Sequence, residues 1–222
     1  MKKTPTVRLT VNASGAARAA AQGDIIVVVD VIDMSTTLEA ALDAGALAVY
    51  GSAPDRATPP VAVDPFVVGR MAGGLAVEKG VGVVLVGEPR VGSDDERLQN
   101  MSLTVSGLRK AGAGINAVLP NIGAETPKLG DLRDSVVIAV TSTGGVAFDA
   151  AVKAGAPAVL TGTVARTMRK KGPAPARAAA ARAIEKAEKT GACITVVAAS
   201  GNSLEDILAA EYITRLIIET LT

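Results

Sequence analysis

The stretch Ile25-Ile26-Val27-Val28-Val29-Asp30-Val31 is followed by Asp33-Met34-Ser35-Thr36-Thr37 and then by Leu38-Glu39-Ala40-Ala41-Leu42. The β-branched run indicates a buried strand and the Ala/Leu-rich run a helix, so the polar cluster is the turn between them. Such strand–turn–helix units predict an α/β fold, with a mostly parallel sheet flanked by helices. Two more copies have the turns Thr141-Ser142-Thr143-Gly144-Gly145 and Ser200-Gly201-Asn202-Ser203.

The first two copies also align with each other. Ala44-Gly45-Ala46 follows the first helix and Ala154-Gly155-Ala156 the second, with a shift of one residue inside the Ser/Thr turn. This pattern favours an internal strand–loop–helix repeat that brings two binding loops side by side. The alternative is that Ala-Gly-Ala after a helix is only common C-cap chemistry. No linker divides the chain, so residues 1–222 are predicted to form a single α/β domain.

The three turns predict an anionic ligand. In a parallel α/β sheet they lie at the carboxyl ends of the strands, where free backbone N–H groups and the positive ends of helix dipoles point at a ligand. Ser and Thr hydroxyls add donors, and a phosphate ester is the simplest ligand of this kind. Each hydroxyl has a structural alternative, which is to cap its helix.

The composition excludes several function classes. Lys+Arg is 23 against Asp+Glu 22, and aromatic residues are 2% of the chain, so nucleic acid is not an expected partner. The chain has no His, which excludes Ser-His-Asp and Cys-His catalysis and leaves oxygen ligands for a hard ion such as Mg²⁺. Neither a signal peptide nor an apolar membrane span is evident, so we expect a cytoplasmic protein without a membrane partner.

The remaining elements are expected from local patterns. Short strands are predicted over 7–11, 46–50, 81–86 and 158–161, and helices over 67–79, 173–189 and 203–221. Residues 51–65 form a Pro-containing loop, and residues 91–107 are predicted to be a loop with a short helix.

Carboxylates occur next to the predicted turns. Asp30 lies within an apolar run, where a carboxylate is costly unless it is paired or binds a cation, and Asp33 follows at the same rim. Glu88 closes another strand and Arg90 follows it. The alternatives are a strand-end Asp that accepts a loop amide, ordinary turn chemistry at Glu88, and a capping box at Ser203-Leu204-Glu205-Asp206. Hydroxyl donors beside carboxylates are what phosphoryl transfer needs.

From about residue 24 onward, the chain resembles the Mg²⁺-dependent 2-phosphosulfolactate phosphatases of coenzyme M biosynthesis. Asp30 to Thr37 is similar to that family's Asp-Val-Leu-Arg-Ala-(Ser/Thr)-Thr-Thr, and Ser203 to Ala210 to its Ser-Leu-Glu-Asp-x-Leu-Ala-Ala. Gly87-Glu88 is similar to the start of its Gly-Glu-Arg-Gly-Gly, and Leu98-Gln99-Asn100 to that of its Leu-Gly-Asn-Ser-Pro. Thr141 to Gly145 takes the place of its Thr-Thr-Asn-Gly-Thr.

The chain also departs from this pattern. Asp33 stands where the family has Arg, a reversal of charge beside the expected anion, and Pro89-Arg90-Val91 replaces Arg-Gly-Gly. These changes put the substrate in question more than the fold.

The resulting hypothesis is a phosphatase that acts on a small phosphorylated anionic substrate and forms a homo-oligomer. Its catalytic residues are Asp30, Asp33 and Glu88, and Mg²⁺ is held by some of Asp30, Glu88, Glu205 and Asp206. The nucleophile is a metal-activated water or, alternatively, Asp30 itself. The alternative function is a non-catalytic relative that binds small anions or serves as an oligomeric scaffold. The substrate-binding residues are Ser35, Thr36, Thr37, Arg90, Asn100, Ser142, Thr143, Gly144, Ser200 and Gly201.

Overall fold

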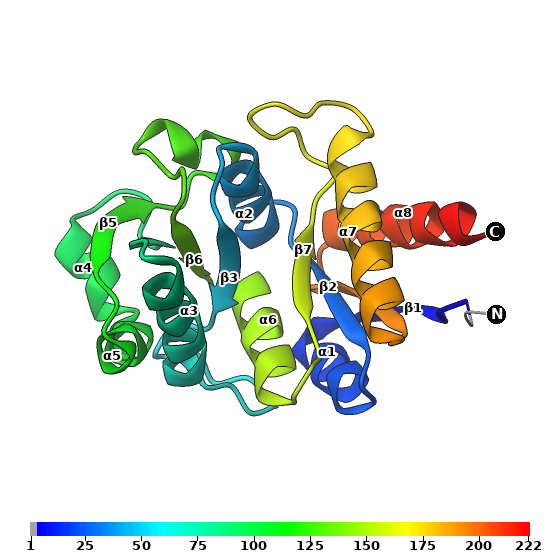
Figure 1. The fold of residues 1–222 in the computed structure, drawn as a ribbon, viewed down its shortest axis with the longest axis horizontal. Helices are drawn as coiled ribbons and strands as arrows, with labels where there is room; N and C mark the ends of the chain where they lie inside the picture. The colour runs from blue at the N-terminus through cyan, green and yellow to red at the C-terminus, as the bar shows by residue number, and fades with distance from the viewer. Residues whose placement is uncertain (1–3) are drawn as a thin grey trace.

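The computed structural model describes residues 4–222, which form two four-stranded parallel sheets flanked by helices (Figure 1). The first sheet has the strand order β1-β8-β2-β7 and the second β3-β6-β4-β5. This confirms the predicted α/β class with parallel strands. The strands are β1 (Val7–Val11), β2 (Ile25–Val29), β3 (Ala48–Ser52), β4 (Val83–Gly87), β5 (Ile115–Pro120), β6 (Val136–Val140), β7 (Val159–Gly162) and β8 (Ile194–Ala198).

The helices cover both sheets, and two of them connect one sheet to the other. Helix α2 leads from β2 in the first sheet to β3 in the second, and α6 leads from β6 in the second sheet back to β7 in the first. The helices are α1 (Asn12–Ala21), α2 (Met34–Asp43), α3 (Pro65–Lys79), α4 (Asp94–Gln99), α5 (Ser102–Ala111), α6 (Gly144–Lys153), α7 (Ala174–Thr190) and α8 (Leu204–Leu221), with a 3₁₀ helix η1 over Gly123–Lys128.

The predicted internal repeat is present as two crossover units, β2–α2–β3 and β6–α6–β7. Both helices have ten residues, and both are followed by a glycine with positive φ, Gly45 at 101° and Gly155 at 86°. Glycine adopts this backbone conformation without the steric cost of a Cβ. The turn is one residue shorter in the second unit, as the sequence alignment required: four residues separate β2 from α2, and three separate β6 from α6.

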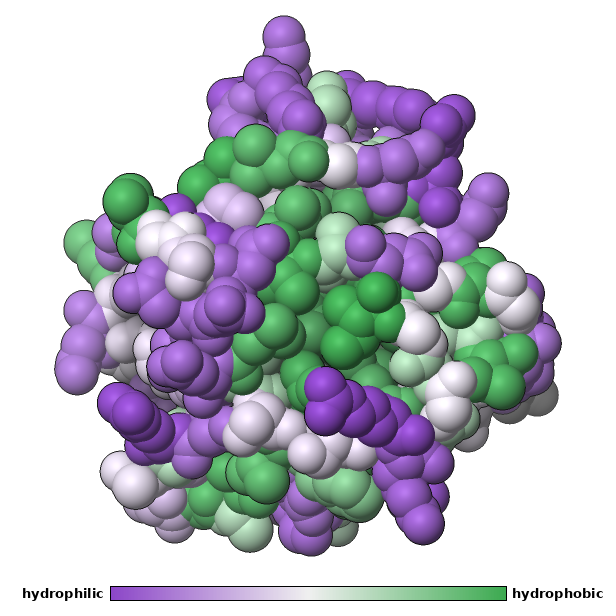
Figure 2. Space-filling view, turned by 90° about the vertical axis from the view of Figure 1, so that its left-hand side faces the viewer, coloured by the Kyte–Doolittle hydropathy of each residue, from purple (hydrophilic) through white to green (hydrophobic). Residues whose placement is uncertain are grey.

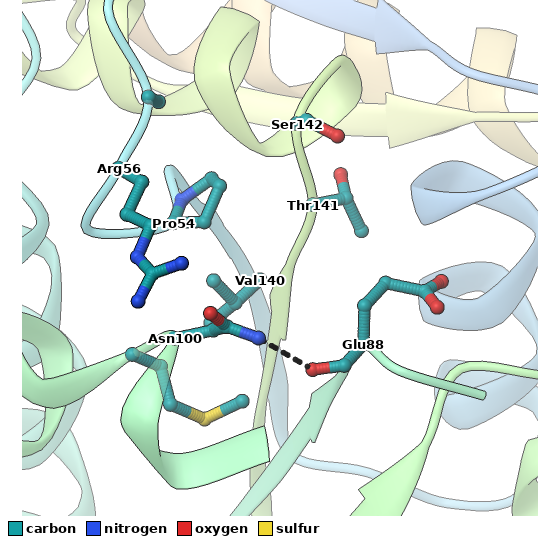
Figure 3. A pocket seen from close by; sticks show the side chains of 9 residues that line it. Pro54, Arg56, Glu88, Asn100, Val140, Thr141 and Ser142 are labelled. Carbon is teal, nitrogen blue, oxygen red and sulfur yellow. Dashed lines mark hydrogen bonds between the residues drawn. The ribbon is translucent and has the colours of Figure 1, made fainter. Parts of the chain in front are cut away.

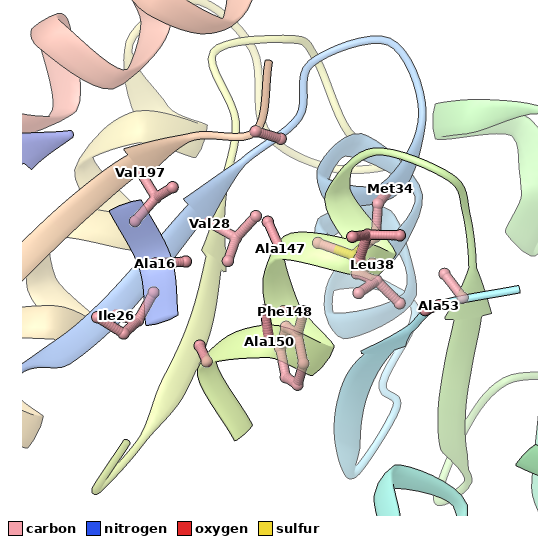
Figure 4. Close-up of a cluster of buried hydrophobic side chains, with 14 of the residues drawn as sticks. Ala16, Ile26, Val28, Met34, Leu38, Ala53, Ala147, Phe148, Ala150 and Val197 are labelled. Atoms are coloured by element: carbon pink, nitrogen blue, oxygen red, sulfur yellow. The ribbon is translucent and has the colours of Figure 1, made fainter. Parts of the chain in front are cut away.

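Alternate residues of the strands pack in different cores, which explains why these strands are apolar throughout. Ile26 and Val28 of β2 join Val84 and Val86 of β4 in one central cluster around α2 and α6, to which Phe148 also belongs (Figure 4). The other side chains of β2 pack under α7 and α8, and those of β4 pack against α3 and α5. One continuous core therefore lies between the two sheets.

Several predicted boundaries were wrong. Strand β2 ends at Val29, so Asp30 follows the strand instead of lying within it. Helix α2 begins at Met34, so Ser35, Thr36 and Thr37 lie in its first turn. Residues 91–107 contain α4 and most of α5, more helix than predicted, because Ser93 and Glu96 form a capping box that the prediction overlooked.

The sequence analysis also missed edge strand β5. Seen from the side of the molecule where β5 lies in Figure 1, apolar side chains occupy the middle of the surface and hydrophilic ones surround them (Figure 2). Within residues 4–222, no helix combines the length and hydropathy needed to cross a bilayer.

Candidate anion-binding site

A pocket of about 300 Å³ lies at the carboxyl ends of β4 and β6 in the second sheet (Figure 3). It brings together three residues predicted from the sequence, Glu88, Asn100 and Ser142. They come from the end of β4, the end of α4 and the turn between β6 and α6. The remaining lining residues are Arg56, Thr141 and the apolar Pro54, Ala57, Met101 and Val140.

The pocket combines one cation with one carboxylate. The side chain of Arg56 reaches into the pocket toward Asn100, and no ion pair to Arg56 occurs within residues 4–222 (Figure 3). The Glu88 carboxylate lies on the other side of the pocket (Figure 3). Asn100 donates from Nδ2 to the backbone oxygen of Glu88 at 3.2 Å, which fixes the carboxamide against the end of β4.

The start of α6 adds donor capacity to this pocket. Ser142 is exposed at the pocket wall immediately before the helix, and Thr143 is the N-cap residue without a side-chain capping bond. Two of the first amides of α6 are already bonded: Gly144 N–H to Asp30 Oδ2 at 2.7 Å and Gly145 N–H to Thr141 Oγ1 at 2.8 Å. The predicted ligand donor Gly144 is therefore satisfied within the protein, and the helix dipole with Ser142 remains on the pocket side.

Arg90 and Asp33 form an ion-paired cluster at the rim instead of two separate ligand groups. Arg90 Nη2 lies 2.5 Å from Asp33 Oδ1, and its Nε lies 3.4 Å from Glu88 Oε1. Buried Arg97 holds the turn below by donating to the backbone oxygens of Pro89 and Arg90 at 3.0 and 3.2 Å. Asp33, which stands where the resembled family has Arg, thus pairs with Arg90 instead of facing the expected anion. Arg90 is therefore not a free cation for a ligand.

Asp30 joins the two sheets. Its carboxylate is 4% exposed and accepts from the amides of Asp33 at 3.1 Å and Gly144 at 2.7 Å. Burial raises the pKa of Asp30 to about 6, and the negative charge of Asp206 adds to this effect. These hydrogen bonds are those of a strand-end Asp that accepts loop amides, which is the alternative to a catalytic Asp30.

Asp206 has the same kind of environment. Its two oxygens accept from the amides of Val31 at 2.9 Å and Ser200 at 3.3 Å, and burial raises its pKa. Ser203 caps α8 by accepting from the Asp206 amide at 3.2 Å, but the predicted capping box is only half formed, because the Asp206 carboxylate accepts from Val31 and Ser200 instead of the Ser203 amide. Glu205 is exposed and accepts from the Ser203 hydroxyl at 3.1 Å.

The hydroxyls of the first turn are used inside the protein. Ser35 Oγ donates to Val28 O at 2.9 Å, Thr36 Oγ1 to Val31 O at 2.5 Å, and Thr37 Oγ1 to Asp33 O at 3.1 Å. All three side chains are buried, so the prediction that they bind substrate is not supported by their geometry. They stabilise the turn between β2 and α2.

The third turn also lies outside the pocket lining. The amide of Gly201 donates to Asn12 Oδ1 at 2.6 Å, and the hydroxyl of Ser200 accepts from the Asn202 amide at 3.2 Å. The pocket is therefore built by the second turn, together with the ends of β4 and α4.

The predicted metal ligands do not form one group. Residues 4–222 contain no cluster of three or more Asp, Glu, Cys or His side chains arranged to hold a metal ion. Asp30 and Asp206 accept backbone amides with both oxygens, Glu88 faces Arg90, and Glu205 is engaged by Ser203. These donors do not fit the Mg²⁺ site that the resemblance implies, and we derive no reaction step through a metal.

Arg56 is the pocket residue that the sequence analysis missed. It lies in the Pro-containing loop between β3 and α3, and its signal is a cation placed four residues beyond the end of β3, a predicted strand. No protein-family model and no curated protein matches the chain in sequence.

Proposed function

We propose that the chain binds a small phosphate monoester in this pocket and hydrolyses it, as a divergent relative of the 2-phosphosulfolactate phosphatases. The observation that carries the proposal is the Arg56 guanidinium, free of ion pairs within residues 4–222, across the pocket from Glu88. A guanidinium with a nearby hydroxyl and a helix N-terminus is a suitable environment for phosphate oxygens.

The chemical roles follow from the positions of the side chains. Arg56 and Ser142 bind the phosphoryl oxygens and stabilise the charge that builds on them in the transition state. Glu88 is the carboxylate that lines the pocket, and it accepts a proton from the attacking water. The water oxygen bonds to phosphorus, the bond between phosphorus and the ester oxygen breaks, and the proton passes to the departing alcohol.

The charges of the pocket also restrict the substrate. One guanidinium and one carboxylate line the pocket, so a ligand with three anionic groups such as 2-phosphosulfolactate meets little net positive charge. A phosphate ester whose organic part carries hydroxyl or ammonium donors suits the pocket better, because such donors can bond to Glu88 or to the Asn100 carboxamide oxygen.

A specific observation favours the alternative of a non-catalytic anion-binding protein. Asp30, Asp33 and Asp206, the acids nearest to the crossover turns, are all engaged by amides or by Arg90. Among the residues that line the pocket, Glu88 is the one acid, so no second carboxylate is at hand to assist hydrolysis. If hydrolysis fails, binding of the anion remains.

The test measures binding and turnover on the same protein. Inorganic phosphate binding is followed by calorimetry, and phosphate release from a panel of small monoesters, 2-phosphosulfolactate included, is followed with Mg²⁺ and with EDTA. We expect Arg56→Ala to weaken phosphate binding by about tenfold or more, since charge-assisted hydrogen bonds contribute about 1.5–3 kcal/mol. Glu88→Gln should keep binding and lose turnover.

Arg109→Ala is the matched control, because Arg109 is an exposed arginine in the last turn of α5. Equal phosphate affinity of Arg56→Ala and the intact chain would refute the anion site. Phosphate binding without release from any ester would refute hydrolysis and leave the binding protein.

A further inference from the structure

The loop from Ala53 to Asp64 carries Arg56 to the pocket. It leaves the carboxyl end of β3 and ends at the N-cap of α3, where Asp64 Oδ1 accepts from the Val67 amide at 3.2 Å. The loop has no regular secondary structure of its own. Because Arg56 makes no ion pair within residues 4–222, its position depends on what holds this loop.

A buried carboxylate on α6 holds both ends of the loop. Asp149 Oδ2 accepts from the Ala53 amide at 3.1 Å, and Asp149 Oδ1 accepts from the Asp64 amide at 2.6 Å. The side chain of Asp149 is fully buried, at 0% exposure, between the apolar neighbours Phe148 and Ala150 of α6. A buried charge is costly, and here it is compensated by amides that belong to one loop.

Two further contacts complete the attachment. Lys153 Nζ, one turn after Asp149 on α6, lies 2.7 Å from Asp64 Oδ2. In the middle of the loop, Asp55 accepts from the amides of Ser102 and Leu103 at 2.7 and 3.1 Å and so caps α5 beside the pocket. Arg56 directly follows Asp55. It therefore lies between two attached residues of the loop, Asp55, bound to α5, and Asp64, bound to α6.

We propose that Asp149 is a positioning residue for the anion site: by binding the amides at both ends of the 53–64 loop, it fixes the Arg56 guanidinium at the pocket. This inference rests on the proposed function, because the pocket is where Arg56 acts. Asp149 is not among the residues that line the pocket, so its role is to position Arg56.

Asp149→Asn tests the mechanism with the smallest change in shape. The amide NH₂ group replaces one acceptor oxygen, so one of the two loop amides faces a donor and loses its hydrogen bond. We expect sulfate affinity to fall about three- to tenfold, because Arg56 then spreads over more positions. In an Arg56→Ala background, Asp149→Asn should cause no further loss.

The pH profile supplies a readout that a purely structural role would not change. Burial raises the pKa of Asp149 to about 6, and the charged groups facing it are Asp64 and Lys153, with Arg70 of α3 acting on Asp64. Sulfate keeps its charge from about pH 5 to pH 8, so its affinity should fall as Asp149 takes up a proton below about pH 6. The sulfate affinity of Asp149→Asn should not show this fall below about pH 6.

Glu39→Gln is the matched control, because Glu39 occupies the equivalent position in α2, four residues before the last residue of the helix. Glu39 is also buried, but it accepts from the Thr161 hydroxyl of β7 and pairs with Arg182 of α7. We expect this variant to keep sulfate affinity. Hydrogen exchange should show faster exchange of the 53–64 amides in Asp149→Asn alone.

The outcomes separate the two proposals. Unchanged sulfate affinity and unchanged exchange of the loop in folded Asp149→Asn would overturn the positioning role. An equal further loss of affinity in the Arg56→Ala background would overturn it as well. If Arg56→Ala itself leaves sulfate binding intact, the proposed function fails, and faster loop exchange in Asp149→Asn then decides whether Asp149 still fixes the loop.

Discussion

The two crossover units have the same outline but different chemistry at the start of their helices. In the β2–α2–β3 unit, the first turn of the helix carries Ser35, Thr36 and Thr37, whose hydroxyls all bond to the protein. In the β6–α6–β7 unit, Gly144 and Gly145 begin the helix, and Ser142 is left exposed at a pocket. The hydroxyls of the first turn are used inside the protein, whereas the glycine-rich turn lies beside the candidate anion-binding pocket.

The units also carry opposite charges at the ends of their helices. Helix α2 ends at Asp43, which pairs with Lys170, and α6 ends at Lys153, which pairs with Asp64. In each unit the ion pair attaches the loop that follows the last strand of the other unit, because Lys170 lies in the loop after β7 and Asp64 in the loop after β3. The two ion pairs thus attach corresponding loops with the charges exchanged.

The largest expected effect concerns the contact between the units at Gly144. A Cβ at this position would overlap the Asp30 carboxylate and lie 2.8 Å from Met34 Cβ. We expect Gly144→Ala to lower the free energy of unfolding by about 3 kcal/mol, through overpacking and loss of the hydrogen bond to Asp30. Urea denaturation measures this change.

Gly74→Ala is the control for Gly144→Ala. Gly74 lies within α3 with open space around its Cβ position, so alanine should stabilise the helix by up to about 1 kcal/mol. Similar effects of the two substitutions would show that the close approach of Asp30 to α6 contributes nothing to stability.

The fold was largely predictable because its signals are local. Buried parallel strands are apolar throughout, and their periodicity with the following helices indicated the class, the repeat and most of the elements. Edge strand β5 was missed because Ile115–Pro120 is partly exposed and begins a segment of mixed polarity. That the strands divide between two sheets depends on the crossing of α2 and α6, which no local pattern contains.

The candidate site was less predictable, because free and bonded polar groups look alike in a sequence. Asp30 and Asp206 resemble ligand carboxylates, yet their oxygens accept backbone amides from distant segments. Arg56 resembles an ordinary loop cation, yet the fold of the 53–64 loop brings it to Glu88 and Asn100. Asp149 could have been singled out as an acid within the apolar run from Val146 to Val152.

The next largest expected effect is the pH dependence of stability caused by the buried acids Asp30 and Asp149, one from each unit. Burial raises the pKa of both Asp30 and Asp149 from 3.8 to about 6. The folded protein therefore holds these protons more tightly than the unfolded chain, so each acid lowers stability as pH rises from about 4 to about 6. The change is about 2–3 kcal/mol per group, at 1.36 kcal/mol per pKa unit.

Asp30→Asn and Asp149→Asn separate the two contributions. Denaturation of each variant across this pH range should show that the stability of the intact chain relative to the variant falls with rising pH. Exposed acids such as Asp131, whose pKa is lowered to about 2 by Arg133, change the stability with pH in the opposite direction. Their contribution is the same in the intact chain and in each variant, so it cancels when the two free energies of unfolding are subtracted. A relative stability that rises with pH would contradict the assignment of raised pKa values.

The smallest effect distinguishes the two exchanged ion pairs. Asp43 is buried, with its side chain 3% exposed, and it also accepts from the Thr167 hydroxyl, whereas the side chain of Asp64 is 28% exposed. Lys170→Met leaves a buried charge without its cation and should cost about 1–2 kcal/mol, while Lys153→Met should cost about 0.5 kcal/mol or less. Salt should reduce the second effect more than the first, since exposed pairs are screened. Equal losses of unfolding free energy in urea denaturation would mean that the two ion pairs attach their loops with equal strength. The two units would then differ only at the starts of α2 and α6.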